Sequence, residues 1–264
     1  MKPNLSDPPA TAEAHCRDCG AAFLYEPIFI GEVDLARPLE THCPACKSEI
    51  EAAEAREGKA RAEAERRELV RQTLPPALLP KTLNPENGTD LAHPDFNLPM
   101  WKLLKLWRPR KAGNWLGLVG PAGRCKTRCL ALLAEKLIMQ GNRLVWTSAM
   151  RLHTETTINL KSRERALHVG AVGLLAECRT APWLIIDDLG NNEWSPPFES
   201  HMFTILDHRR THCLPTAFSS NTHPMRFHRL ITSVNPEALI GRLLEGTSLF
   251  DFTPPDQLEI PSLS

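Results

Sequence analysis

A glycine-rich stretch at residues 120–127 constrains the fold of this chain more than any other feature. It reads Gly-Pro-Ala-Gly-Arg-Cys-Lys-Thr and lies between an apolar run at 115–119 and a helical pattern at 126–140. A loop placed between a strand and a helix can point its backbone N–H groups at a phosphate, close to the positive end of the helix. The pattern predicts a phosphate-binding loop, with Lys126 on the β- and γ-phosphates and the Thr127 hydroxyl on Mg²⁺.

All eight loop residues are candidate nucleotide-binding residues: Gly120, Pro121, Ala122, Gly123, Arg124, Cys125, Lys126 and Thr127. The two glycines allow the backbone to approach a phosphate closely. Cys125 stands where the pattern has glycine, and a Cβ atom there could crowd the phosphate or strain the loop. The alternative interpretation is a glycine-rich turn that merely precedes Lys-Thr.

A second motif, Leu-Ile-Ile-Asp-Asp at 184–188, ends a predicted buried strand in two successive carboxylates. Phosphoryl-transfer sites need an acidic residue at the end of a neighbouring strand for Mg²⁺, and a base for the attacking water. Two adjacent buried aspartates without compensation would be costly. Together the two motifs predict one ATP site that uses Mg²⁺.

The body of the chain alternates apolar strands with helical patterns. Near-continuous apolar runs between helices indicate a parallel sheet covered on both faces, so the fold class is α/β. The expected strands are 115–119, 144–147, 183–186 and 216–219, and the expected helices are 126–140, 165–178 and 198–209.

From about residue 80 to residue 252 the chain resembles the AAA+ ATPases of the DnaC/IstB type, which are helicase loaders and transposition ATPases. The resemblance rests on the segments 120–127, 184–190, 214–221 and 238–252. It implies a P-loop AAA+ core with a parallel sheet between helices. The given sequence ends at residue 264, soon after the last predicted strand, so we expect no C-terminal helical lid.

The resemblance also implies roles for four residues. Asp187 would bind Mg²⁺, and Asp188 would take the place of the usual catalytic base. Asn221 matches a polar residue that contacts the γ-phosphate or the water. Arg242 matches an arginine finger that reaches into a neighbouring subunit, which implies a homo-oligomer. The alternatives are a strand-terminating turn for Asn221 and an ordinary surface arginine for Arg242.

The function implied by this resemblance belongs to DNA replication. An ATPase of this type would assemble on single-stranded DNA and engage a protein partner such as a replicative helicase. One alternative is a transposition-regulating ATPase that targets duplex DNA. Another is a nucleotide-binding scaffold without turnover, because of Cys125.

Two Cys-x-x-Cys pairs near the N-terminus predict a zinc site with the ligands Cys16, Cys19, Cys43 and Cys46. A segment this poor in apolar residues needs a metal to fold, and a small β-ribbon fits between two such knuckles. The alternative is a redox dithiol. The ribbon is not visibly basic, so it could dock on protein as readily as on DNA.

Composition changes along the chain divide it into four parts: a zinc ribbon (1–50), a charged helical spacer (51–74), the ATPase domain (75–255) and a tail (256–264). Charged pairs at i,i+4 favour a helix in the spacer. The stretch 101–111 holds five basic residues and two tryptophans, which could contact DNA or form an amphipathic helix that packs on the domain.

Bulk composition excludes little. Basic and acidic residues number 31 each, so the net charge does not favour nucleic acid, and any basic surface must be local. The sequence has no apolar run long enough to span a membrane and no secretory signal, so we expect a cytoplasmic protein. In that reducing compartment the eight cysteines favour thiols or metal ligands over disulfides.

Overall fold

The structure is a computed structural model that describes residues 11–26, 29–30, 33–34, 42–79, 114–191, 193–231 and 236–253. The chain divides into two compact units, Met1–Glu65 and Arg66–Ser264. The basic stretch 101–111 and the tail 256–264 lie outside the described residues. Within the described part, no helix is both long enough and apolar enough to cross a bilayer.

The first unit contains two small hairpins and the beginning of a long helix. Strand β1 (Ala12–His15) pairs antiparallel with β2 (Ala22–Tyr25), and β3 (Phe29–Ile30) pairs with β4 (Val33–Asp34). Helix α1 (Pro44–Thr73) begins at a proline, a residue suited to the first helical position. The helix predicted for the spacer therefore forms, and it contributes residues to both units.

The second unit is built on one five-stranded sheet in which every neighbouring pair is parallel. The strand order is β6-β7-β8-β5-β9. The strands are β5 (Trp115–Val119), β6 (Leu144–Ser148), β7 (Trp183–Asp187), β8 (Thr216–Ser220) and β9 (Thr247–Asp251). The predicted α/β class and the four predicted strands are confirmed. In the sheet, β5 lies between β8 and β9, the two strands that are farthest from it in sequence.

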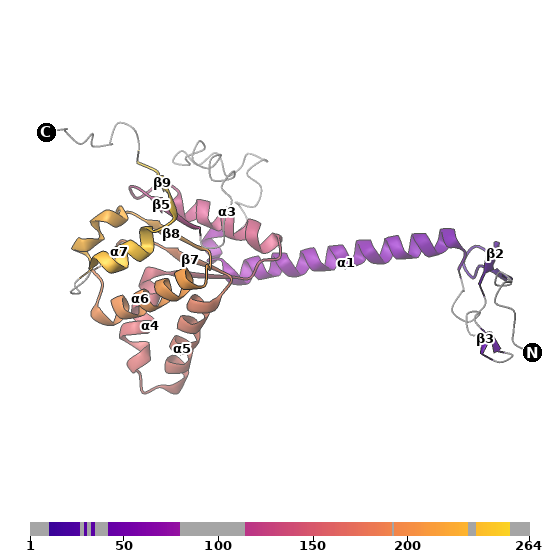
Figure 1. Cartoon of the computed structure of the whole chain (residues 1–264), viewed down its shortest axis with the longest axis horizontal. Coiled ribbons are helices and arrows are strands. Elements are labelled where there is room, and N and C mark those ends of the chain that lie inside the picture. Colours follow the sequence, from indigo (N-terminus) through magenta and orange to yellow (C-terminus); the bar gives the residue numbers. More distant parts are fainter. Residues whose placement is uncertain are drawn as a thin grey trace, which may run out of the picture. The chain divides into compact units, whose positions relative to one another are not determined.

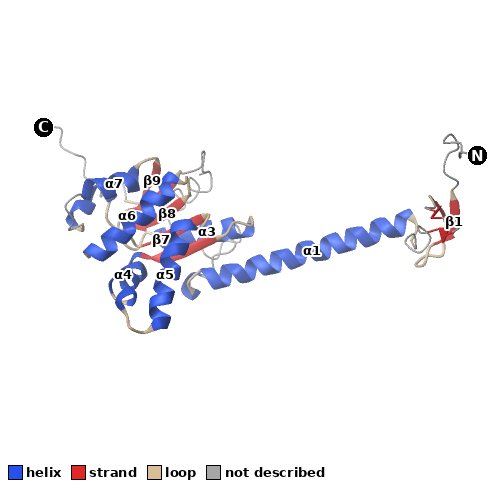
Figure 2. Ribbon diagram, turned by 60° about the horizontal axis from the view of Figure 1, so that its bottom comes forward, coloured by secondary structure: helices blue, strands red, loops and turns tan. Residues whose placement is uncertain are grey.

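Helices pack on both faces of this sheet, as Figures 1 and 2 show. One face is covered by α3 (Lys126–Met139), by Val70 near the end of α1 and by Leu74 just after it. The other face is covered by α4 (Ala149–Thr157), α5 (Arg165–Thr180), α6 (Pro196–Thr211) and α7 (Pro236–Leu244). Short 3-10 turns occupy Pro76–Leu78, Asn159–Lys161 and Pro224–Arg229.

Alternating residues of the strands supply the two cores. Trp115 and Val119 of β5 face one core, whereas Leu116 and Leu118 face the other. All five residues of β5 are buried, as expected for a central parallel strand. The phosphate-loop candidate therefore begins at the carboxyl end of a fully buried strand, where its position is set by the rigid part of the fold.

The fully buried Arg209 of α6 joins the end of α5 to the beginning of β8. Its guanidinium donates to the carbonyl oxygens of Cys178 (3.0 Å), Ala181 (2.8 Å) and Pro215 (2.5 Å). Its Nε donates to the Thr216 hydroxyl at 2.8 Å. Burial lowers the pKa of Arg209 to about 10, so the side chain stays charged at neutral pH. The arginine satisfies carbonyl groups that the helix end leaves without a backbone partner.

We expect the substitution Arg209→Leu to destabilise the second unit by about 3 kcal/mol, because several carbonyl groups would stay buried without a donor. For a unit of this size the loss corresponds to a fall in Tm of about 6–12 °C in thermal unfolding. Arg179→Leu, at an exposed position of α5, is the matched control and should leave Tm nearly unchanged. A shift of less than about 2 °C for Arg209→Leu would contradict this role.

Candidate functional site

The loop after β5 follows a path that requires glycine. Gly120 has φ 127°, and a Cβ atom there would lie 2.9 Å from the backbone nitrogen of Thr253. The backbone N–H of Phe252 donates to the Val119 carbonyl at 2.7 Å, which holds the chain after β9 against the start of the loop. Gly123 also lies in the left-handed region, with φ 76°. Both glycines therefore occupy conformations that other residues rarely adopt.

Cys125 adopts a glycine-like conformation as well. Its φ of 56° is in the left-handed region, and it is the residue that precedes the first turn of α3. A side chain in this region costs about 1–2 kcal/mol. Cysteine in place of glycine at position 125 therefore costs free energy because of its backbone conformation.

We expect Cys125→Gly to raise ATP affinity or turnover about five- to thirtyfold, because glycine removes that backbone cost. Cys125→Ala separates the two causes, since it removes the thiol and keeps the Cβ atom. If alanine improves the site as much as glycine does, the thiol rather than the backbone is responsible. ATP affinity and steady-state hydrolysis, measured under reducing conditions, decide between them.

Lys126, the first residue of α3, is buried and points to the end of the sheet. Its Nζ donates to the Pro121 carbonyl of the loop and to Oδ1 of Asn221, both at 2.7 Å. Burial lowers the pKa of Lys126, and the nearby carboxylates of Asp188 and Asp187 oppose that shift. The ammonium group thus lies between the loop and two acidic side chains.

Asp187 is the last residue of β7, and its carboxylate is shared by two hydroxyl groups. The hydroxyl of Thr127 donates to Oδ1 of Asp187 at 2.8 Å, and the Ser219 hydroxyl donates to the same oxygen at 2.5 Å. The phosphate loop and the acidic strand end are therefore in direct contact. A hydroxyl and a carboxylate side by side are oxygen ligands of the kind that Mg²⁺ prefers, so Thr127 and Asp187 fit that ion.

Asp188 turns away from the strand with a φ of 62°. Its backbone N–H donates to the Ser219 hydroxyl at 2.8 Å, and its Oδ1 accepts from Nδ2 of Asn221 at 3.2 Å. Asn191 donates to the second carboxylate oxygen of Asp188. Burial, followed by the charge of Asp187, raises the pKa of Asp188.

The structure thus brings Lys126, Thr127, Asp187, Asp188 and Asn221 together, as the sequence motifs suggest. Of the other loop residues, the Pro121 carbonyl accepts from Lys126, Ala122 and Gly123 are exposed, and Arg124 is half-buried.

Two members of the site were missed. Ser219 is the last residue of the predicted strand 216–219, and a hydroxyl at the carboxyl end of a buried strand was the signal that could have identified it. Asn191 follows the second motif closely, but its contact depends on the fold of the turn.

Arg242 of α7 does not join this network among the described residues. Its Nε donates to Oδ1 of Asp207 on α6 at 2.8 Å, and its Nη1 lies 3.8 Å from a carboxylate oxygen of Glu245. The neighbouring Arg210 donates to the Arg242 carbonyl at 2.8 Å, and its guanidinium stacks 3.6 Å from the ring of Trp115. The side chain of Arg242 is 43% exposed. The end of its helix is held by the hydrogen bond from Arg210.

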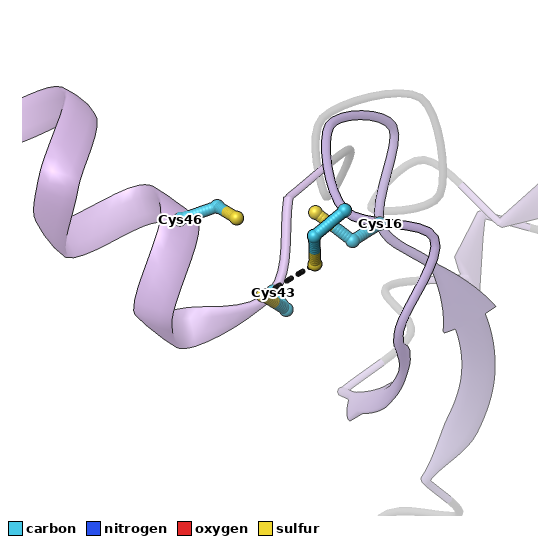
Figure 3. Close-up of side chains that lie close together, drawn as sticks. Cys16, Cys43 and Cys46 are labelled. Atoms are coloured by element: carbon cyan, nitrogen blue, oxygen red, sulfur yellow. Dashed lines mark hydrogen bonds between the residues drawn. The ribbon is translucent and has the colours of Figure 1, made fainter.

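In the first unit the four predicted cysteines gather in one cluster. The sulfur atoms of Cys16, Cys19, Cys43 and Cys46 all lie within 4.8 Å of one another, and those of Cys19 and Cys43 are 3.6 Å apart. Sulfur atoms around a tetrahedral zinc ion lie about 3.8 Å apart, from Zn–S bonds of about 2.3 Å. Cys16 comes from the β1–β2 turn and Cys46 from the first turn of α1, as Figure 3 shows.

The surroundings of the cluster agree with a cation between the thiols. Hydrogen bonds from the backbone of Cys19 and Cys43 lower the pKa of the Cys16 thiol to about 6. Interactions with the sulfur groups of Cys19, Cys16 and Cys43 raise the pKa of Cys46. A divalent cation would neutralise this crowding and hold all four groups as thiolates.

One detail differs from expectation. The second Cys-x-x-Cys pair does not form a knuckle turn like the first, because Pro44 begins α1 and the pair is presented by a helix N-terminus. Nε2 of His42, the residue before Cys43, lies 3.4 Å from a carboxylate oxygen of Asp18. The first pair does lie in a tight turn, in which the Gly20 N–H donates to the Cys16 carbonyl at 2.9 Å and Gly20 has φ 73°.

Comparisons with known proteins give likenesses of fold. No family model and no curated protein matches this chain. Among solved structures, DnaI is 23% identical over 59% of this chain and 79% of its own length, with a TM-score of 0.46. The DnaC helicase loader is 19% identical over 58% of this chain and 86% of its own, with a TM-score of 0.43.

A structure of AMPPCP-bound DnaA from Aquifex aeolicus is 18% identical over 58% of this chain, with a TM-score of 0.46. This chain spans only 44% of that DnaA chain. The DnaC structure is that of a helicase loader, the type of protein that the sequence resembles. At these identities the likeness concerns the fold, and the chemistry of the site rests on the residues described above.

Proposed function

We propose that this chain is an AAA+ ATPase of the helicase-loader type, which binds and hydrolyses ATP and acts in DNA replication. One observation carries the proposal: Thr127 of the phosphate loop donates to Asp187 at the end of β7, with Lys126 and Asp188 beside them. A glycine-rich loop at a helix N-terminus, a buried lysine and two strand-end carboxylates are what phosphoryl transfer from a nucleoside triphosphate requires.

Each residue has a distinct task in this proposal. Lys126 and the loop N–H groups bind the phosphates, while Thr127 and Asp187 hold Mg²⁺. When bound, that ion neutralises charge on the phosphate oxygens. Asp188 accepts a proton from the attacking water, and Asn221 orients the water or the γ-phosphate.

Arg242 is proposed to act in a neighbouring copy of the chain. It is partly exposed on α7, and its contacts with Asp207 and Glu245 are the ordinary ion pairs of a half-exposed side chain, which contribute little energy. A phosphate of a second subunit would therefore compete effectively for the guanidinium. This arrangement requires a homo-oligomer with ATP at the subunit interface.

The zinc cluster is proposed to stabilise a docking module for a protein partner such as a replicative helicase. The four sulfur atoms of the cluster fit one zinc ion. For the ATPase unit, the proposed ligand is single-stranded DNA. ATP at the subunit interface would favour assembly of the ATPase on DNA, and hydrolysis of the ATP would reverse that assembly.

The test is ATP turnover and single-stranded DNA binding by the full chain, each measured with ATP, with ADP and without nucleotide. The proposal expects hydrolysis, tighter DNA binding with ATP than with ADP, and little preference for duplex DNA. A stronger response to duplex DNA would favour the transposition-regulator alternative. Absence of nucleotide binding would refute the proposal as a whole.

A nucleotide-binding scaffold without turnover is the second candidate. It is favoured by the left-handed conformation of Cys125, which the usual glycine would adopt without cost. ATP binding with no hydrolysis, in the presence of DNA and of the partner, would support it.

A further inference from the structure

The turn that follows β7 is held by several independent contacts. Asp188 has a φ of 62°, and its N–H donates to the Ser219 hydroxyl at 2.8 Å. The next N–H, of Leu189, donates to the Ser219 carbonyl at 2.8 Å. Gly190 has no room for a side chain, because a Cβ atom would lie 2.2 Å from the Ser220 hydroxyl oxygen. The chain therefore has little freedom where it leaves the strand.

This turn brings Asn191 back over the carboxylate of Asp188. Nδ2 of Asn191 donates to Oδ2 of Asp188, and Oδ1 of Asn191 accepts from Nδ2 of Asn221 at 2.8 Å. The same Asn221 amide donates to Oδ1 of Asp188 at 3.2 Å, and its carbonyl accepts from Lys126 at 2.7 Å. Each carboxylate oxygen of Asp188 thus has an amide donor, and one of the two donors is tied to the phosphate-binding lysine.

We propose that Asn191 is a positioning residue that holds one oxygen of Asp188, while Asn221 releases the other when Lys126 binds a phosphate. This inference rests on the proposed function. A charged phosphate oxygen is a stronger acceptor for an ammonium group than an amide oxygen is. The nucleotide therefore draws Lys126 away from Oδ1 of Asn221. The Asn221 side chain then loses one of the contacts that fix it, so its Nδ2 can turn from Oδ1 of Asp188, and that oxygen becomes available to a water molecule. Asn191 keeps the carboxylate from rotating at that moment.

We expect Asn191→Ala to lower kcat for ATP by about ten- to a hundredfold, because a freely rotating carboxylate is misplaced for proton transfer. The Kd for ATP should stay within about twofold of wild type, because the contacts of Asn191 are with Asp188 and Asn221 and not with the loop. Asn191→Asp keeps the shape but replaces the donor by an acceptor, and should lose at least as much turnover. A purely structural role would instead lower Tm and weaken ATP binding.

Asn159→Ala is the matched control. Asn159 donates from Nδ2 to a carboxylate oxygen of Glu155 at 2.8 Å, so the variant removes the same kind of hydrogen bond elsewhere in the fold. It should leave both kcat and Kd unchanged. If Asn191→Ala has the wild-type kcat or a higher one, Asn191 does not position Asp188 productively and the inference is overturned.

A second measurement does not depend on turnover. Affinity for ADP with aluminium fluoride, a mimic of the phosphoryl group in transit, should fall in Asn191→Ala about tenfold relative to affinity for ADP alone. If Asn191→Ala changes the affinity for ADP with aluminium fluoride no more than the affinity for ADP alone, the inference is overturned. This holds even if the wild type does not hydrolyse ATP. If the wild type binds no nucleotide, the proposed function itself fails and this assignment fails with it.

Discussion

Lys126→Ala is expected to weaken ATP binding by roughly a thousandfold, about 4 kcal/mol. Lys126 is buried between Pro121 and Asn221, and its ammonium is the charge that the loop offers to a phosphate. Removing one partner of a desolvated charge pair typically costs 2–5 kcal/mol. Binding of a fluorescent ATP analogue would measure the loss. Lys136→Ala, near the other end of α3, is the control and should bind as the wild type does.

Asp188→Asn, which belongs to the same prediction, separates binding from chemistry. The amide keeps the size of the side chain but cannot take a proton from water, so turnover should fall about 10²- to 10⁴-fold. ATP affinity should be nearly unchanged, because Thr127, Lys126 and Asp187 remain. Hydrolysis at the wild-type rate would show that Asp188 is not the base. A parallel loss of ATP binding would show instead that it holds the nucleotide.

The second large effect is expected at the cysteine cluster. The full chain, purified without chelator, should contain one zinc ion, and Cys43→Ser should lower bound zinc by more than about tenfold. Zinc binding to small Cys-rich sites is worth about 10–16 kcal/mol at neutral pH, which is folding free energy for a module of this size. The first unit of the variant should therefore be cleaved rapidly by protease.

Cys213→Ser is the matched control, because Cys213 is exposed and belongs to the second unit. It should keep full zinc content and the wild-type cleavage pattern. ATP binding should survive in both variants, since the second unit has its own core. Less than about half an equivalent of zinc in the wild type would contradict the assignment and favour a redox dithiol.

The sequence predicted those parts of the fold that local patterns encode. The strands were recognised because residues buried on both faces of a parallel sheet form nearly continuous apolar runs, as in Trp183–Asp187. The loop was recognised because glycines precede Lys126 and Thr127 at a fixed spacing. Helix α4 was missed, although Ser148 caps it by accepting from the Arg151 N–H at 3.2 Å.

The contacts of the site could not be derived in the same way. Asn221, Asn191 and Lys126 come from three different elements, and their meeting depends on the order of the strands in the sheet. A local pattern carries no information about that order. The resemblance implied a role for Asn221. It gave none for Asn191, whose amide reaches Asp188 because of the turn at Gly190.

The position of β5 in the sheet has a consequence for synthesis. It is the first strand of the sheet to be made, yet its neighbours β8 and β9 follow roughly a hundred residues or more later. Gly120 also packs against Thr253, just beyond β9. A nascent chain therefore cannot complete its phosphate loop until almost all of the second unit has left the ribosome. Until then the apolar β5 has no strand partners, and this is the interval in which aggregation or chaperone binding is most expected.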